Sequence, residues 1–263
     1  MRSARFDVSN ALLGLRSSCS VPRVQPNSDA AQRRDLMRQA ACVAGAWLVA
    51  SALPVVAAGE MQHHPRSLLV DPHGKPWSAR QLKPGEAFLF NYPYTASPVF
   101  LIAFEHEVKP AELVTEDKRR YSAPAGVGPD KSIVAFSAIC AHKLMYPTTA
   151  ISFIGLRSGG RGEPPHVIHC CGDNSRYDPL QGARVIDGPA PQPLAAVLLE
   201  WDAGGDQLHA VGTRGGEMFD AFFEKYAAKL ELETGSGLRK PSAATVVMQP
   251  AASYSRQWRS CRA

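Results

Sequence analysis

The chain has 263 residues, of which 45% are hydrophobic and 20% are charged, with a net charge of +5 and an isoelectric point near 8.9. This composition suits a globular protein with one large domain or two small ones, and it excludes fibrous and fully disordered classes. The basic residues are concentrated in the N-terminal segment and the last 30 residues. They form no clustered stripe, so binding to nucleic acid is not expected.

The first 60 residues are interpreted as a targeting region outside the fold. Residues 1–32 are polar and without periodicity, which predicts a disordered leader. Residues 33–59 begin with two arginines and continue into an apolar stretch, which resembles a twin-arginine export signal. The same stretch is long enough to span a bilayer. Cleavage after Ala58 and retention as a membrane anchor both remain open.

Residues 66–233 are predicted to form a mainly antiparallel β domain, because short apolar runs alternate with turn-forming residues. The charged stretch between 105 and 129 predicts a solvated connection, and 216–226 is the best helix candidate. Residues 234–263 predict a disordered tail, in which Cys261 would be a free thiol. The expected strands are 67–70, 87–92, 99–104, 132–139, 150–154, 166–169, 195–200 and 208–211.

Two groups of potential metal ligands each follow a predicted strand. Cys140 and His142 form a Cys-x-His pair, and Cys170 and Cys171 open a second group. Six cysteines in all are too few and too unevenly spread for a disulfide scaffold. Two hairpin tips fixed by a rigid sheet can converge on a metal. The pattern therefore indicates metal chemistry.

Together the two groups resemble the Rieske family, in which Cys-x-His on one loop and Cys-x-x-His on another bind a [2Fe–2S] cluster. The following stretch is similar to the family's Ser-x-aromatic-Asp sequence, whose hydroxyls, here Ser175 and Tyr177, would donate hydrogen bonds towards the cluster sulfurs. Residues 188–194 resemble the Pro-rich loop that covers the cluster. The resemblance spans about 130–213 and implies an antiparallel Rieske-type β-sandwich with a cluster-binding subdomain.

The sequence departs from the family pattern at the second histidine. Counting from Cys170 puts Asp173 at that position and Asn174 on the family's glycine, without a gap. Counting from Cys171 puts Asn174 there and requires a one-residue deletion. The first register is preferred. It gives four ligands, which are Cys140, His142, Cys170 and Asp173. An anionic aspartate should lower the potential below the His₂ range of about −150 to +300 mV.

The alternative register keeps Cys171 and Asn174 as candidate cluster ligands, with His169 and His166 as the nearest replacement imidazoles. The disulfide that ties the two loops in many quinol-oxidising members lacks its first partner, because no cysteine follows His142 in 143–147. Cys171 would then be unpaired, as a vestige or an alternative ligand.

The resemblance implies a one-electron carrier: a subunit of an oxidoreductase complex like the Rieske subunit of quinol–cytochrome c reductase or the small subunit of arsenite oxidase. Such a subunit is not itself catalytic. The expected partners are cytochrome b- or c-type or other oxidoreductase subunits, with quinol as a candidate substrate. They would dock at an exposed tip of Leu144, Met145 and Pro191.

The expected location is the inner membrane of a bacterium, with the domain facing the periplasm, or the periplasm itself. The twin-arginine route carries folded proteins, which suits a cofactor inserted before export. Two other functions stay open. One is a degenerate Rieske-fold structural or binding subunit without a complete cluster. The other is a zinc site of Cys140, His142 and Cys170 with Asp173 or His169.

Overall fold

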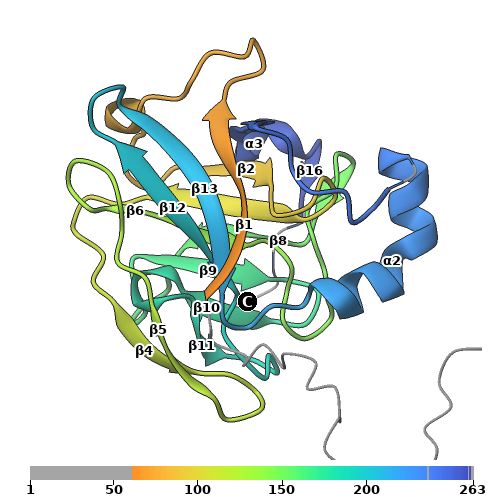
Figure 1. Ribbon diagram of the computed structural model, residues 1–263. Helices are drawn as coiled ribbons and strands as arrows, with labels where there is room; N and C mark the ends of the chain where they lie inside the picture. The colour runs from red at the N-terminus through yellow and green to blue at the C-terminus, as the bar shows by residue number, and fades with distance from the viewer. Residues whose placement is uncertain (1–60, 236, 260, 262–263) are drawn as a thin grey trace, which may run out of the picture. The chain divides into compact units, whose positions relative to one another are not determined.

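A computed structural model describes residues 61–235, 237–259 and 261 (Figure 1). The segments 1–32 and 33–59, expected as leader and as signal or anchor, lie outside the described residues. No helix within the described ranges is long and apolar enough to cross a membrane. The elements in chain order are β1 (Met61–Val70), η1 (Ala79–Gln81), β2 (Ala87–Asn91), β3 (Pro98–Ala103), β4 (Ala111–Val114), β5 (Arg120–Ala123), β6 (Ile133–Ser137), β7 (Ile151–Ser152), β8 (Ile154–Ser158), β9 (His166–Cys170), β10 (Ser175–Asp178), η2 (Pro179–Gln181), β11 (Arg184–Asp187), β12 (Ala196–Asp202), β13 (Gln207–Arg214), α2 (Phe219–Thr234), β14 (Thr245–Val247), β15 (Gln249–Pro250), α3 (Ala251–Tyr254) and β16 (Gln257–Trp258).

The described chain is mainly β, as the sequence predicts. An eight-stranded sheet has the order β14-β1-β13-β12-β6-β3-β2-β15, and a four-stranded sheet has the order β11-β10-β9-β8. The pairs β4–β5 and β16–β7 form two small sheets. Pairing is antiparallel apart from β1 with β14 and β16 with β7. The prediction of a mainly antiparallel β fold is therefore confirmed.

Strands β3 and β6 are buried along their whole length and separate two hydrophobic clusters. Successive side chains of a strand point to opposite faces, so alternate residues enter different clusters. Phe100 and Phe136 pack with Ile154 and Ile168 of the four-stranded sheet. Their neighbours, such as Leu101, pack in the second cluster with residues of the larger sheet. The candidate ligands Cys140 and Cys170 belong to the first cluster.

The stretch 105–129, expected as a solvated connection, contains the hairpin β4–β5. Leu113 and Tyr121 are buried on it, and the charged residues lie at its turn. Gly182 permits close packing there, because a Cβ at that position would lie 2.5 Å from the Cβ of Ala123. The charge run marks the exposed tip of an ordered element.

The expectation of a disordered tail is wrong for 237–259. β14 pairs with β1, β15 pairs with β2, and β16 pairs with β7. Met248 is fully buried, and its carbonyl accepts a hydrogen bond of 2.9 Å from the Trp77 indole. These short strands form because the sheets offer open edges, which a local composition rich in Ser, Ala and Arg does not reveal.

The helix predicted over 216–226 is α2, which starts at Phe219 and continues to Thr234. Its buried residues Phe222 and Phe223 pack with Leu144 and Tyr146, which follow Cys140 in the chain. The helix therefore supports the first of the two ligand-bearing loops.

Candidate metal centre

The first loop follows β6 and closes on itself around Cys140. The Cys140 N–H donates to the Met145 carbonyl at 2.9 Å, and the Leu144 N–H donates to the Cys140 carbonyl at 2.9 Å. Leu144 adopts a left-handed φ of 57°, which is uncommon for a residue with a side chain. The turn buries Cys140 completely and leaves the His142 side chain 40% exposed.

The second loop joins β9 to β10, and Cys170 pairs with Ser175 across its base. The Asn174 N–H donates to the Cys170 carbonyl at 2.8 Å. Asn174 has a left-handed φ of 65°, a conformation that Gly adopts freely and Asn tolerates. This backbone supports the register in which Asn174 stands at the family's glycine and Asp173 at its histidine.

The two loops bring four candidate ligands together. The sulfur atoms of Cys140 and Cys170 and a carboxylate oxygen of Asp173 all lie within 4.8 Å of one another. Asp173 Oδ2 is 3.2 Å from Cys140 Sγ and 3.1 Å from His142 Nδ1. The other carboxylate oxygen, Oδ1, accepts a hydrogen bond of 2.9 Å from the Ser175 N–H. Asp173 is thereby oriented with one oxygen facing the first loop.

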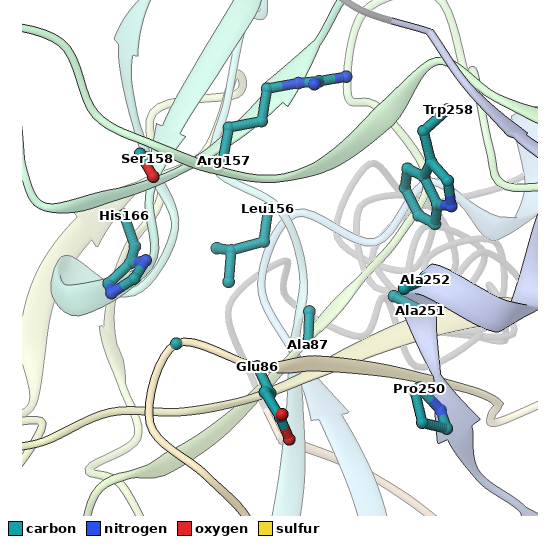
Figure 2. Close-up of a pocket in the computed structure, with 11 residues that line it drawn as sticks. Glu86, Ala87, Leu156, Arg157, Ser158, His166, Pro250, Ala251, Ala252 and Trp258 are labelled. Carbon is teal, nitrogen blue, oxygen red and sulfur yellow. The ribbon is translucent and has the colours of Figure 1, made fainter.

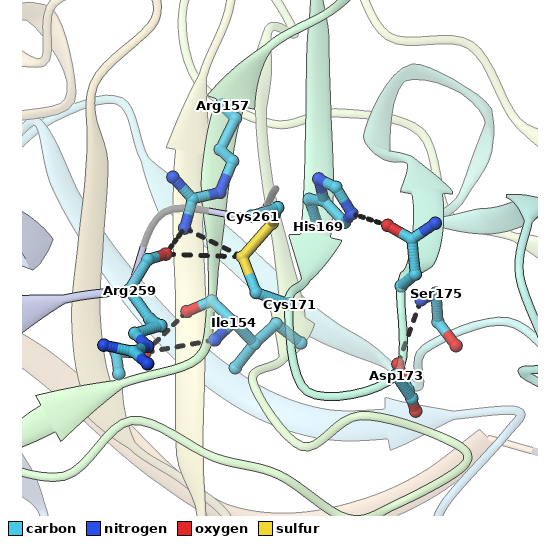
Figure 3. The surroundings of a disulfide bond; sticks show 10 residues. Ile154, Arg157, His169, Cys171, Asp173, Ser175, Arg259 and Cys261 are labelled. Carbon is cyan, nitrogen blue, oxygen red and sulfur yellow. Dashed lines mark hydrogen bonds between the residues drawn. A yellow bond between two sulfur atoms is a disulfide. The ribbon is translucent and has the colours of Figure 1, made fainter. Parts of the chain in front are cut away.

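The other two candidate ligands are placed elsewhere. Asn174 Oδ1 lies 2.7 Å from His169 Nε2 and so is paired outside the group. Cys171 forms a disulfide with Cys261, 90 residues away in sequence (Figure 3). The predictions that Cys261 is a free thiol and that Cys171 is unpaired or an alternative ligand are therefore wrong. The pairing of β16 with β7 carries the tail to the second loop, a contact too distant in sequence to leave a local signal.

An arginine reinforces this disulfide. Arg157 of β8 donates from Nη2 to the Arg259 carbonyl and lies 3.3 Å from Cys171 Sγ (Figure 3). The second loop is consequently tied on its outer side to the C-terminal segment, at the residue next to Cys170.

The thiols of Cys140 and Cys170 have opposite pKa shifts. The hydrogen bond with Cys170 lowers the pKa of Cys140 to about 7, with help from the Tyr177 hydroxyl and against the effect of burial. The same interaction and burial raise the pKa of Cys170. Burial alone would raise the pKa of Asp173, but hydrogen bonds from the Ser175 N–H and the two thiols outweigh it and lower that pKa. The pKa values of Cys140 and Asp173 are both lowered, which is the direction that a bound cation would reinforce.

Two hydroxyls predicted to face the cluster lie at the site. The Tyr177 hydroxyl accepts from the Ala141 N–H at 3.1 Å and lies 3.4 Å from Cys140 Sγ. Burial is the main reason that the pKa of Tyr177 is raised. Ser175 is fully buried, and its hydroxyl has no hydrogen-bond partner of acceptable geometry among the described residues. Ser175 lies opposite Cys170 and next to the Asp173 carboxylate, and a buried hydroxyl there without a partner of acceptable geometry fits a centre that carries inorganic sulfide.

Gly188, at the start of the Pro-rich loop, packs tightly on the second loop. A Cβ at Gly188 would lie 2.5 Å from the Asn174 carbonyl oxygen and 2.6 Å from Ser175 Cα, so only glycine allows this approach. Gly172 similarly approaches Met145 of the first loop. Leu144, expected at an exposed apolar tip with Met145 and Pro191, is only 7% exposed and packs beneath α2.

A pocket lies away from these ligands (Figure 2). It has a volume of about 450 Å³ and is lined by residues that include Leu156, His166 and Trp258. His166 stands at the end of β9 remote from Cys170, and Leu156 stands in the middle of β8, opposite Ile168. The thiols and the carboxylate therefore belong to a compact centre inside the core and not to a large substrate cleft.

No family model matches the sequence. Among solved structures, the chain is similar to the soluble domain of Rieske protein II from Sulfolobus acidocaldarius, with 27% sequence identity and a TM-score of 0.41. The alignment covers 57% of this chain and 78% of that chain. A superposition this loose does not by itself define a family.

Proposed function

We infer that this protein binds a [2Fe–2S] cluster of the Rieske type and transfers one electron at a time. The observation that carries this inference is the convergence of Cys140, His142, Cys170 and Asp173 from two hairpin loops. Cys140 and Cys170 would hold one iron, and His142 and Asp173 would hold the other. The cluster, when bound, supplies the one-electron redox chemistry.

The protein residues would set the potential and the exposure of the centre. Hydrogen bonds that Tyr177 and Ser175 would donate to sulfur in the bound cluster would favour the reduced state, whereas the Asp173 carboxylate would favour the oxidised one. The half-exposed His142 connects the buried group to the surface, while the two cysteines are fully buried. No residue is required as a catalytic acid or nucleophile, which agrees with an electron-transfer subunit.

The proposed setting is an exported oxidoreductase complex, in the periplasm or anchored to the inner membrane through the N-terminal segment. The Cys171–Cys261 disulfide supports an oxidising compartment, because such bonds are rare in reducing cytosol. The twin-arginine-like sequence supports export in the folded state. The proposed partners are cytochrome b- or c-type subunits, with quinol as a candidate electron donor.

A single zinc ion is the second candidate, supported by the close spacing of the ligand atoms. Two thiolates, a carboxylate and an imidazole make an acceptable tetrahedral set, and three of these ligands lie within 4.8 Å of one another. A zinc centre would give the site a structural role. It would provide no use for the orphaned Ser175 hydroxyl.

The deciding experiment is metal and acid-labile sulfide analysis of the purified full-length protein, with EPR of the reduced sample. We expect iron and sulfide in equal amounts, about two of each per chain. A folded protein that contains zinc and no sulfide would replace the first proposal by the second. A folded protein with neither would indicate a degenerate structural subunit.

A further inference from the structure

Three lysines border the candidate centre on one side. Lys143 belongs to the first loop, and its ammonium lies 3.4 Å from the Gly172 carbonyl of the second. Lys225 of α2 donates to the Lys143 carbonyl at 2.7 Å. The ammonium of Lys229, one helical turn further along, lies 4.9 Å from the centre of the Tyr146 ring. These three residues are called the lysine rim.

The lysine rim is held in place by a rigid aromatic contact. Tyr146 lies edge-on to Phe222 and Tyr226, with ring centres 5.0 Å apart in each pair. Phe222 is fully buried. Tyr226 packs on Tyr146, which lies in the first loop six residues after Cys140. The helix thus presents its lysines at a fixed position beside the centre.

The positive charge of the lysine rim is largely uncompensated. Within the described part of the chain, no carboxylate lies within salt-bridge distance of Lys143 or Lys225. Only Lys229 has such a partner, Glu233 at 3.8 Å. Asp173, the nearest acidic residue of the loops, has a side chain only 1% exposed. Lys143 and Lys225 are both exposed, and among the described residues their ammonium groups bind backbone carbonyls of the two loops and no carboxylate.

We propose that the lysine rim and the exposed edge of His142 form the docking surface for a redox partner with an acidic face. This inference rests on the proposed electron-transfer function. Carboxylates of a partner would pair with Lys143 and Lys225 and would steer the approach of the partner by long-range attraction. Docking there places the partner next to His142, the exposed member of the ligand group.

A charged lipid surface is a less suitable occupant of this site. Three lysines, one of them paired with Glu233, fall short of the basic clusters that hold proteins on anionic membranes. The surface also surrounds a redox centre, which a lipid would not use. Lipid binding through these lysines would therefore contradict the proposal.

The test compares one acceptor in two charge forms. A small basic c-type haem protein and the same protein with its lysines succinylated are used as probes of the full-length chain at low ionic strength. Binding is measured by calorimetry, which requires no cluster. Electron transfer from the reduced chain is measured by stopped-flow absorbance. We expect the succinylated form to bind at least about tenfold more tightly and to be reduced faster, with both differences disappearing at high salt.

Matched variants locate the surface. Lys143→Glu with Lys225→Glu should abolish the preference for the succinylated probe, and Lys143→Gln with Lys225→Gln should weaken it by an intermediate factor. Lys75→Glu with Lys83→Glu makes the same change in net charge outside both loops and α2, and it should retain most of the preference. Thermal unfolding of each variant verifies that the fold is intact.

Equal binding by the two glutamate pairs would overturn the proposal, because the attraction would then follow net charge alone. Binding to vesicles with 30% anionic lipid that depends on Lys143 and Lys225, with no preference between the haem probes, would also overturn it. Absence of iron and sulfide in a chain that still binds the succinylated probe through these lysines would refute the electron-transfer function and leave the acidic docking surface standing.

Discussion

The two ligand-bearing loops differ in what holds them. The first loop is supported from within and below: it closes on itself through Cys140, and Leu144 and Tyr146 pack under α2. The second loop is held from outside, by the disulfide to Cys261 and by the close approach of Gly188. One loop depends on apolar burial, and the other on a covalent tie and tight backbone contact. The same centre should therefore respond differently to changes on its two sides.

The largest effect is expected from the buried cysteines, where both loops should behave alike. Cys140→Ser and Cys170→Ser each remove a thiolate ligand, so each variant should lose the iron and the EPR signal entirely. Metal and sulfide analysis measures the loss. Cys171→Ser is the matched control, and it should retain at least part of the iron because its sulfur is occupied by the disulfide. Loss of iron in that control, with retention in Cys170→Ser, would reverse the register of the second loop.

The Cys171–Cys261 disulfide is the clearest difference between the two loops. Cys261→Ser opens a covalent link that spans 90 residues, so the free energy of unfolding should fall by about 2–5 kcal/mol and the Tm by roughly 5–15 °C. Calorimetry of the variant measures the change. The double variant Cys171→Ser with Cys261→Ser should match the single one, because both lack the same bond. An unchanged Tm would mean that Arg157 and Gly188 suffice to hold the loop.

The next effect in size is a change in reduction potential, which tests whether Asp173 is the fourth ligand. Asp173→His replaces an anionic ligand by a neutral imidazole, so the reduction potential should rise by on the order of 100 mV. Asn174→His should leave the potential nearly unchanged, because Asn174 is turned towards His169. Protein-film voltammetry of the two variants makes the comparison. A rise in Asn174→His alone would contradict the placement of Asp173 at the centre.

The smallest effect is expected from the Tyr177 hydroxyl, which connects β10 to the first loop. Tyr177→Phe removes a hydrogen bond to Cys140 Sγ and leaves the ring in the core, so the potential should fall by on the order of tens of millivolts. The Ala141 N–H also loses its acceptor, so some instability of the first loop is expected with it. An unaltered potential in a variant that retains its iron would show that this hydroxyl does not interact with the centre.

The sequence alone determined the elements that depend on local pattern. The central strands lie close to the predicted residue ranges. They are buried on both faces, so each appears in the sequence as a short apolar block between turn-forming residues. The two ligand groups were also visible, because spacing within a hairpin tip is a local property. The preference for Asp173 over Asn174 followed from the downstream Ser-x-Tyr-Asp stretch, and the left-handed backbone at Asn174 supports it.

Only the tertiary structure decided the features that depend on distant partners. The tail of 237–259 is ordered because β14, β15 and β16 find strand edges far away in sequence. Cys171 pairs with Cys261, and Leu144 is buried because α2 lies over it. Composition cannot reveal such contacts, since they depend on where the folded sheets leave an edge or a face uncovered. Likewise, only the folded chain shows that no described carboxylate lies within salt-bridge distance of Lys143 or Lys225.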